Sequence, residues 1–324
     1  MPADAVSPAS AFPFFAPGDS LRKRILHFFG TVLLIAFFGA GAVTLTFYVV
    51  SLNDELAEDR LLPGGEKLPP PEPFLSRYDR WVRAVVGSGF SDFGQSNKVV
   101  VKQVLGTRLW VTVTVGSVSW FLAWGLGFAL AALLATRLRA YAGAHQRAVY
   151  PIAQAVPSLV VVIVFYLILL QIDPNSSRGT RTAVGVTALV ALMLPATAAL
   201  WLNGINRVLS SEYVRALRAR GLSPMALWTR HVIPNVIASS GILTQAVFSL
   251  AGLIVGSAFV EGVFRLGGIA EAFIEGTRHG HAELCAFATL LYFSVTAVGV
   301  LLTELLVLVV DPEGGAARAE AESQ

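Results

Sequence analysis

Charge is scarce in this sequence. Charged residues make up only 14% of the 324 residues, whereas soluble domains are roughly a quarter charged, and hydrophobic residues reach 55%. This balance excludes an ordinary soluble globular protein and indicates a chain that folds in lipid. The net charge is +3, and no basic cluster is interleaved with aromatic residues, which argues against a nucleic-acid partner.

Cysteine and the common catalytic motifs are also missing. The single cysteine, Cys285, excludes an intrachain disulfide framework and a thiolate metal cluster, and we expect it to be a packing residue. Residues 64–67 lack the earlier glycine and the following Ser or Thr of a phosphate-binding loop. No Ser/His/Asp or paired-carboxylate arrangement is credible, so we predict that the chain is not an enzyme and uses no cofactor. His279, His281 and Glu283 form only a weak metal-contact pattern, and we predict no metal site.

Six long apolar stretches are present instead. A helix that crosses about 30 Å of hydrocarbon needs about 20 apolar residues, because every backbone amide must be bonded inside it. Stretches of that size occur at 28–50, 109–136, 148–172, 182–206, 232–260 and 284–310. We therefore predict an all-α integral membrane protein with six transmembrane helices.

These stretches divide the chain into five parts. We predict a disordered cytoplasmic tail at 1–21, a first transmembrane helix at 22–50, an external loop at 51–107, a five-helix core at 108–310 and a second cytoplasmic tail at 311–324. The external loop contains the polyproline-like stretch 69–73. We expect a short interfacial helix after it, near 75–86, and a solvated spacer is the alternative.

Basic residues at the ends of the apolar stretches indicate the orientation. Lys and Arg accumulate in short cytoplasmic loops. Here they are Arg22, Lys23 and Arg24 before the first stretch, and Arg137, Arg139 and Arg147 after the second. The loop at 51–107 is long and carries both signs of charge, so it is a poorer indicator. We predict that both termini are cytoplasmic.

The connection at 207–235, between the fourth and fifth stretches, has the pattern of two short helices around a glycine. Ser210 or Ser211 can cap the first helix, and Glu212 suits its positive end. Gly221 is then a natural C-terminal stop.

A second short helix is expected after the glycine. Ser223 can cap it, and Pro224 is tolerated as its first residue because the missing N–H had no intrahelical partner. Val214, Leu217 and Leu222 supply an apolar side. The side that stays in water is basic and comprises Arg215, Arg218 and Arg220. We predict a compact, basic, amphipathic knob between two membrane spans.

The spacing within this loop carries a family resemblance. Glu212 and Gly221 stand nine residues apart, Pro234 closes the loop, and Tyr213 follows the glutamate. This pattern resembles the EAA loop of the permease subunits of binding-protein-dependent ABC importers, and Glu-Tyr-Val-Arg is similar to the dipeptide and oligopeptide branch. The resemblance implies the type I ABC importer permease fold and a coupling helix that seats in a groove of a separate ATPase. It assigns this contact to Glu212, Tyr213, Arg215, Ala216, Arg218, Gly221, Leu222 and Pro234. An ordinary basic loop that only sets topology is the alternative.

Further similar segments run through most of the chain. They are 91–96, 156–158, 194–196, 254–264 and 308–312. The Gly-Arg-Asp segment usual in C-type partners is missing, so the chain is identified as a B-type subunit. Trp110 and residues 266–268 depart from the family pattern, which leaves the geometry of the outer gate open.

A few polar side chains lie inside the apolar stretches. An ionisable group at the centre of a span costs at least about 2.5 to 3.5 kcal/mol, and an unpaired amide facing lipid is also expensive. The candidates for lining a polar passage are Gln154, Asn203, Gln245 and Glu304. Each amide could equally bond across helices, and a structural role is the alternative for Glu304.

The resemblance implies a function and a set of partners. The chain is expected to be the permease subunit of an ATP-driven importer for short peptides and to form half of the pore in the inner membrane. The expected partners are a C-type permease, two ATP-binding subunits, an external substrate-binding protein and membrane lipid. Nickel chelates, glutathione or sugars are alternative cargoes within the family. A stand-alone secondary transporter and an intramembrane assembly protein are the alternatives outside it.

Overall fold

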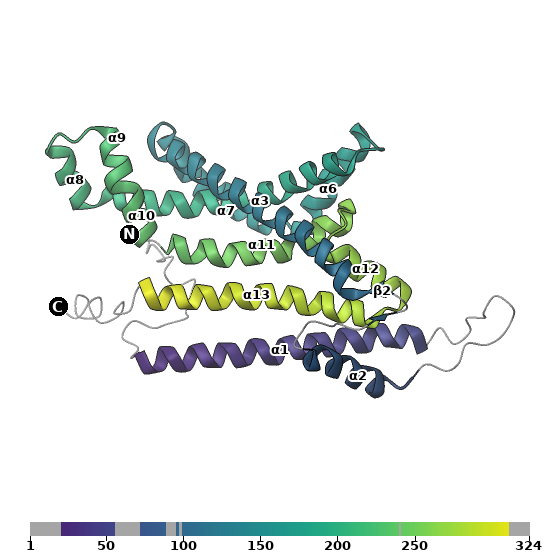
Figure 1. Cartoon of the computed structure of the whole chain (residues 1–324). Helices are drawn as coiled ribbons and strands as arrows, with labels where there is room; N and C mark the ends of the chain where they lie inside the picture. Colours follow the sequence, from purple (N-terminus) through teal and green to yellow (C-terminus); the bar gives the residue numbers. More distant parts are fainter. Residues whose placement is uncertain (1–20, 56–71, 89–94, 97–98, 240, 311–324) are drawn as a thin grey trace.

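The computed structural model describes residues 21–55, 72–88, 95–96, 99–239 and 241–310. Within them the chain forms a bundle of long helices that run side by side, with shorter helices at both ends (Figure 1). Most of the expected tail at 1–21, all of the expected tail at 311–324, most of the polyproline-like stretch 69–73 and most of the segment 91–96 lie outside the described residues.

Helices form nearly all of this bundle. In chain order they are α1 (Leu21–Glu55), α2 (Phe74–Gly87), α3 (Val101–Thr136), α4 (Arg139–Ala144), the π-helix η2 (His145–Val149), α5 (Tyr150–Ala155), α6 (Ser158–Ile172), α7 (Arg178–Ser210), α8 (Glu212–Ala219), α9 (Pro224–Leu227), the π-helix η3 (Trp228–Val232), α10 (Ile233–Ser239), α11 (Ile242–Phe264), α12 (Ile269–His279) and α13 (Ala282–Val310). A single antiparallel pair joins β1 (Gln95–Ser96) to β2 (Val99–Val100). The all-α prediction is confirmed apart from this two-residue pair.

Five of the described helices are long and apolar enough to cross a membrane: α1, α3, α7, α11 and α13. The sixth candidate is a bent pair, Ala140–Ala155 with Ser158–Ile172, whose halves meet at 82°. The expected span at 148–172 is therefore not one continuous helix. Val156 takes an extended conformation at ψ 122°, because the ring of Pro157 disfavours the helical conformation in the residue before it.

The fifth expected span, 232–260, also begins too early. The structure ends α10 at Ser239 and starts α11 at Ile242, after Gly241 adopts a left-handed conformation at φ +64°. Residues 232–239 belong instead to the group of short helices between α7 and α11. Hydropathy alone joined these two segments because both are apolar.

Small residues let the long helices approach closely. A Cβ added to Gly127 of α3 would lie 2.4 Å from Thr197 Oγ1 of α7, and one added to Gly116 would lie 2.8 Å from the Cα of Ile254 in α11. The Thr197 hydroxyl donates a hydrogen bond to the carbonyl of Ala123 at 3.0 Å. Such close packing and interhelical hydrogen bonding are what hold helices together in lipid, where the hydrophobic effect between spans is absent.

The helix α2 occupies the residues for which a short helix was expected near 75–86. It packs on α1 through aromatic side chains, with Phe47 fully buried against Phe74, Tyr78 and Trp81. The hydroxyls of Thr44 and Tyr78 share a hydrogen bond of 2.6 Å. These contacts hold α2 against the end of α1 that is distant from α8 and α9 (Figure 1).

Candidate functional site

Residues 211–239 form a group of short helices at one end of the bundle, which we call the knob. It comprises α8, α9, η3 and α10, and Figure 1 shows α8 and α9 projecting beyond the end of the long helices. The knob connects α7 directly to α11, two of the candidate spans. A movement of the knob therefore acts on both.

The first arm of the knob, α8, has local signals at both ends. Ser211 caps it, since its side chain accepts a hydrogen bond of 3.4 Å from the Val214 amide. Ser210 ends α7 instead, and its hydroxyl donates to the carbonyl of Arg207. Glu212 in the first turn complements the positive end of the helix dipole. Of the two capping residues left open by the sequence, the structure selects Ser211.

Gly221 ends this arm in the left-handed conformation. Its φ is +78°, and its amide donates to the carbonyl of Arg218 at 3.0 Å while the Leu222 amide donates to that of Leu217 at 3.4 Å. This pair of bonds is a common helix ending for which glycine is preferred. A Cβ on Gly221 would meet no atom of the chain within 4 Å. The glycine is thus required by the backbone turn, and it faces open space.

The second arm begins at Ser223, whose side chain accepts a hydrogen bond of 3.3 Å from the Ala226 amide. Pro224 occupies the first helical position. After one turn the helix widens into the π-helix η3 before it continues as α10. π-Helical turns are rare in proteins, and those that occur often lie at functional sites.

Apolar side chains fasten both arms to the bundle. Val214 and Val232 are fully buried, and Leu217 and Leu227 are buried with them. They share one cluster with Leu134 of α3 and with residues of α7. The knob is therefore a packed part of the bundle and presents one fixed outer surface.

The outer surface of the knob is charged at its centre. The side chains of Glu212 and Arg215 are 94% and 67% exposed and form a 3.5 Å ion pair. An exposed pair of this kind contributes at most about 1 kcal/mol, so both charges can be redirected to a binding partner. The other predicted contact residues that are exposed are Tyr213, Ala216, Arg218, Gly221 and Pro234, and Leu222 is half-buried.

Met225 was missed by the sequence reasoning. It lies in the first turn of α9, and 74% of its side chain is exposed. An exposed, flexible apolar side chain is characteristic of protein contact surfaces. The available signal was its position directly after the Ser-Pro helix start, where the side chain points away from the packed side.

A side-chain contact between the two arms was also missed. The hydroxyl of Tyr213 on α8 and Nδ1 of His231 in η3 lie 2.8 Å apart, and their rings meet edge to face. The two residues are 18 positions apart in sequence. This contact joins the beginning of the first arm to the end of the π-helix.

We expect Tyr213→Phe to loosen the knob without unfolding the chain. The variant keeps the ring and loses only the hydrogen bond, whose net contribution is about 0.5 to 1.5 kcal/mol. Hydrogen exchange of the amides of η3 and α10 should become faster by up to about tenfold, since 1.4 kcal/mol is a factor of ten. Tyr141→Phe, at a 65% exposed tyrosine of α4, is the control. Equal exchange in both variants would contradict a bracing role.

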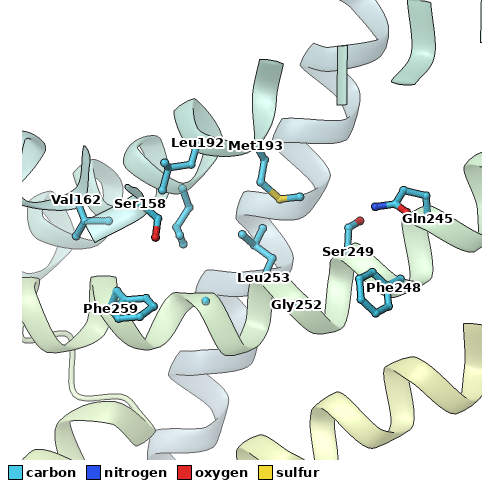
Figure 2. A pocket seen from close by; sticks show the side chains of 12 residues that line it. Ser158, Val162, Leu192, Met193, Gln245, Phe248, Ser249, Gly252, Leu253 and Phe259 are labelled. Atoms are coloured by element: carbon cyan, nitrogen blue, oxygen red, sulfur yellow. The ribbon is translucent and has the colours of Figure 1, made fainter. Parts of the chain in front are cut away.

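The structure does not bring the four expected pore residues together. Gln245 lines a cavity of about 350 Å³ between α6, α7 and α11, together with Ser158, Ser249 and apolar side chains. Figure 2 shows Gln245 and Ser249 at one end of this cavity, with Ser158 and Phe259 at the other. The hydroxyl of Ser249 accepts hydrogen bonds of 3.0 Å from two indole N–H groups, and the other polar side chains that line this cavity are those of Gln245 and Ser158.

The other three candidates lie elsewhere. Gln154 is exposed on α5, outside this cavity. The side-chain oxygen of Asn203 on α7 accepts a hydrogen bond from Gln146 of η2, a contact between helices. Glu304 is 4% exposed inside α13. The part of the chain that the structure describes holds no group of three or more His, Cys, Asp or Glu residues that could bind a metal ion.

Comparison with known proteins gives consistent results. The sequence profile of the family described as "Binding-protein-dependent transport system inner membrane component" matches residues 124–313, more than half of the chain and all of the knob. The dipeptide transport system permease protein DppB of Lactococcus lactis subsp. cremoris is 26% identical over 90% of this chain and 98% of its own length. The oligopeptide transport system permease protein OppB of Escherichia coli K12 is 22% identical over 84% of this chain and 93% of its own length.

A solved structure has a similar fold. A chain of the MetNI methionine ABC transporter in an inward-facing conformation matches with a TM-score of 0.53 and 19% identity, over 67% of this chain and 99% of that chain. This likeness concerns the arrangement of helices alone.

Proposed function

The chain belongs to the family of binding-protein-dependent transport system inner membrane components, and we propose that it forms half of the translocation pore of an ATP-driven importer for short peptides. It is a multi-pass permease with the type I ABC importer fold. ATP hydrolysis in this family belongs to separate subunits. The cargo, the partner set and the orientation in the membrane are parts of the proposal.

The knob is the observation that carries this proposal. It is packed on its inner side through Val214 and Leu217, and it displays an acidic residue, arginines and Met225 on its outer side. A rigid surface of mixed charge with exposed apolar side chains such as Met225 suits a groove in a protein partner. We place the ATP-binding subunit on this surface, in contact with Glu212, Tyr213, Arg215, Ala216, Arg218, Gly221, Leu222 and Pro234.

This placement sets the orientation. ATP is cytoplasmic, so the knob and the ends of α1 and α13 on the same side of the bundle (Figure 1) face the cytoplasm. Both termini are then cytoplasmic, in agreement with the basic residues before the first span and after the second. The turn between α11 and α12 lies on the outer face, where the substrate-binding protein docks.

Short peptides are the proposed cargo because the relatives are named for dipeptides and oligopeptides. The cavity beside α6 and α11 supports this choice. It is lined mainly by apolar side chains and offers the amide of Gln245 as a hydrogen-bonding group. A cavity without a charged lining residue accommodates varied side chains, which leaves selection to the receptor.

Affinity purification of the chain from its own membranes tests the proposal. We expect two ATP-binding subunits, a second permease of the C type and an external binding protein to co-purify. In proteoliposomes, a dipeptide or oligopeptide with the binding protein should stimulate ATP hydrolysis several-fold, and a protonophore should not reduce uptake.

The same assay separates the alternatives. Stimulation by nickel chelates, glutathione or sugars in place of peptides would correct the cargo and keep the family mechanism. Uptake that follows an ion gradient and needs no ATP would show a secondary transporter. Absence of any substrate flux would indicate an assembly protein and would overturn the proposal.

A further inference from the structure

A carboxylate is buried at the end of α11 that lies opposite the knob. Glu261 is fully buried, and its carboxylate accepts a 2.9 Å hydrogen bond from the Ser257 hydroxyl and a 3.2 Å hydrogen bond from the Ala270 amide. The hydroxyls of Thr112 and Tyr292 lie beside the same carboxylate. One side chain thus accepts hydrogen bonds from α11 and from the first turn of α12, and it lies beside hydroxyls of α3 and α13.

The first turn of α12 is built on this carboxylate. A Cβ added to Gly268, the residue before the helix, would lie 2.0 Å from Oε2 of Glu261 and 2.9 Å from Oγ1 of Thr112. The Ile269 amide donates to Thr112 Oγ1 at 3.0 Å, and the Ala270 amide donates to Glu261. The free N–H groups at a helix start need partners. Here α3 and α11 supply them, because Gly268 has no side chain to do so.

The turn before α12 is fixed from a further helix. Arg265 and Gly267 both adopt positive φ angles, +53° and +76°. The guanidinium of Arg178, at the start of α7, donates to the carbonyl of Leu266. The Gly267 amide donates to the side chain of Glu271. The departures from the family pattern at 266–268 therefore fall in a turn that several hydrogen bonds hold in place.

The hydrogen bonds to the Glu261 carboxylate are expected to form together or to break together. Among the residues that the structure describes, no Lys or Arg lies within ion-pair distance of its carboxylate. Its burial is compensated by hydrogen-bond donors alone, and a buried carboxylate that loses its donors is strongly disfavoured. The start of α12 cannot slide along α11 by small steps without giving up these bonds.

The helix α11 connects this turn to the knob. It begins at Ile242, three positions after α10 ends at Ser239, and its 23 residues span about 35 Å at 1.5 Å per residue. Figure 1 shows α12 at the end of the bundle opposite α8 and α9. One continuous helix therefore links the proposed ATPase contact to α12.

We propose that Glu261 is a positioning residue that makes α12 move as one body with α11, so that the motion of the knob reaches the outer face where the binding protein docks. This inference rests on the proposed function. It assigns to α12 the role of the outer element that responds to ATP binding inside.

Two replacements of Glu261 test the role of its hydrogen bonds. In Glu261→Leu, ATP-binding subunits should still co-purify and basal ATP hydrolysis should persist, while stimulation by the binding protein and uptake fall at least tenfold. Glu261→Gln should restore both. Its amide oxygen can accept from Ala270, and its NH2 group can donate to Ser257, whose hydroxyl is both donor and acceptor.

A second variant approaches the same contact from the other side. Gly268→Ala keeps the glutamate at position 261, but the added methyl group would displace its carboxylate. This variant should therefore also lose stimulation of ATP hydrolysis by the binding protein. Glu275→Gln is the matched control on α12. It removes the 2.7 Å ion pair with Arg108, in which the Glu275 side chain is 45% exposed, and it should leave stimulation unchanged.

A distance measurement follows the movement itself. Spin labels at Leu243→Cys, near the knob end of α11, and at Arg278→Cys on α12 use two exposed positions, and the native Cys285 is buried. Pulsed EPR should give one narrow distance distribution with and without ATP in the parent chain. In Glu261→Leu the distribution should broaden.

Several outcomes would overturn the inference. They are a distance that changes with ATP in the parent chain, full stimulation in Glu261→Leu, or failure of Glu261→Gln to restore it. Loss of membrane assembly in both Glu261→Leu and Gly268→Ala would also overturn it, since the contacts would then be needed for folding alone. If no ATP-binding subunit co-purifies with the parent chain, the proposed function fails, whereas the effect of Glu261→Leu on the label distance still decides whether Glu261 fixes α12.

Discussion

We expect the Gly221→Glu variant to insert in the membrane and to lose both ATPase co-purification and uptake. Gly221 adopts φ +78°, a conformation that costs a residue with a Cβ about 1 to 2 kcal/mol. The new carboxylate would also project into the open space in front of the knob, where the partner is proposed to bind. Because 1.4 kcal/mol is a factor of ten, the combined loss of affinity should exceed about tenfold. Pull-down of the ATP-binding subunits and uptake by intact cells measure it.

The Gly221→Asn variant separates the two causes. Asparagine tolerates the left-handed conformation better than other side chains do, so the knob should keep its shape, as judged by hydrogen exchange in α8. If Asn binds the ATPase normally, the defect of the Glu variant comes from charge and bulk at the contact. If Gly221→Glu retains both ATPase binding and uptake, the knob does not couple to an ATPase.

The second large effect is expected at the crossing of α3 and α7. Gly127→Ala would place a methyl group 2.4 Å from Thr197 Oγ1 and 3.1 Å from the Ala198 amide nitrogen. Overpacking of this kind costs about 1 to 3 kcal/mol, and it would also strain the hydrogen bond between Thr197 and Ala123. We expect a lower yield and a melting temperature lower by several degrees. A thiol-reactive dye follows the unfolding, because the single cysteine, Cys285, is fully buried.

Gly125→Ala is the matched control for this change. It adds the same methyl group two positions earlier in α3, where no atom lies within 4 Å. Replacing a helical glycine by alanine is favourable by up to about 1 kcal/mol, so this variant should be as stable as the parent or more stable. Equal melting temperatures for the two variants would mean that α3 and α7 do not cross as closely as the structure shows.

The sequence alone predicted the structural role of Gly221 but not that of Gly127. The role of Gly221 as a helix stop was predicted from its neighbours, since Ser211, Glu212 and Gly221 act within a few residues of one another. Gly127 gave no such signal. It and Gly125 are two glycines in one apolar stretch, and only the position of α7 distinguishes them.

The errors in the expected spans have a similar origin. Hydropathy detects whether a stretch prefers lipid and is insensitive to the direction of the backbone. The run 148–172 is predominantly apolar although the chain bends by 82° near Pro157, and the run 232–260 continues through the left-handed Gly241. Proline and glycine were visible at both places, but the same residues also occur inside long helices, as Pro195 does in α7.

The four candidate pore residues show most clearly what the sequence does not predict, which is the direction in which a residue of a helix faces. Gln154, Asn203, Gln245 and Glu304 were selected because each is polar inside an apolar stretch, and of these only Gln245 lines the described cavity. Which side of a helix faces protein, lipid or a passage depends on neighbours that are distant in sequence. For the same reason the Tyr213–His231 contact and the contacts of Glu261 were not foreseen.

The sequence by itself determined that this chain enters the membrane, where most of its spans lie, that a two-helix knob follows the fourth span, and to which family it belongs. These properties follow from hydropathy, helix capping and short motifs, which act between residues close together in the chain. The tertiary structure alone decided where spans break, which glycines carry close helix crossings, and that one buried carboxylate gathers four helices at the end opposite the knob. The breaks fall at a proline and a glycine, residues that long helices also contain, and the other two features arise from contacts between segments up to 157 positions apart, which no local pattern of residues specifies.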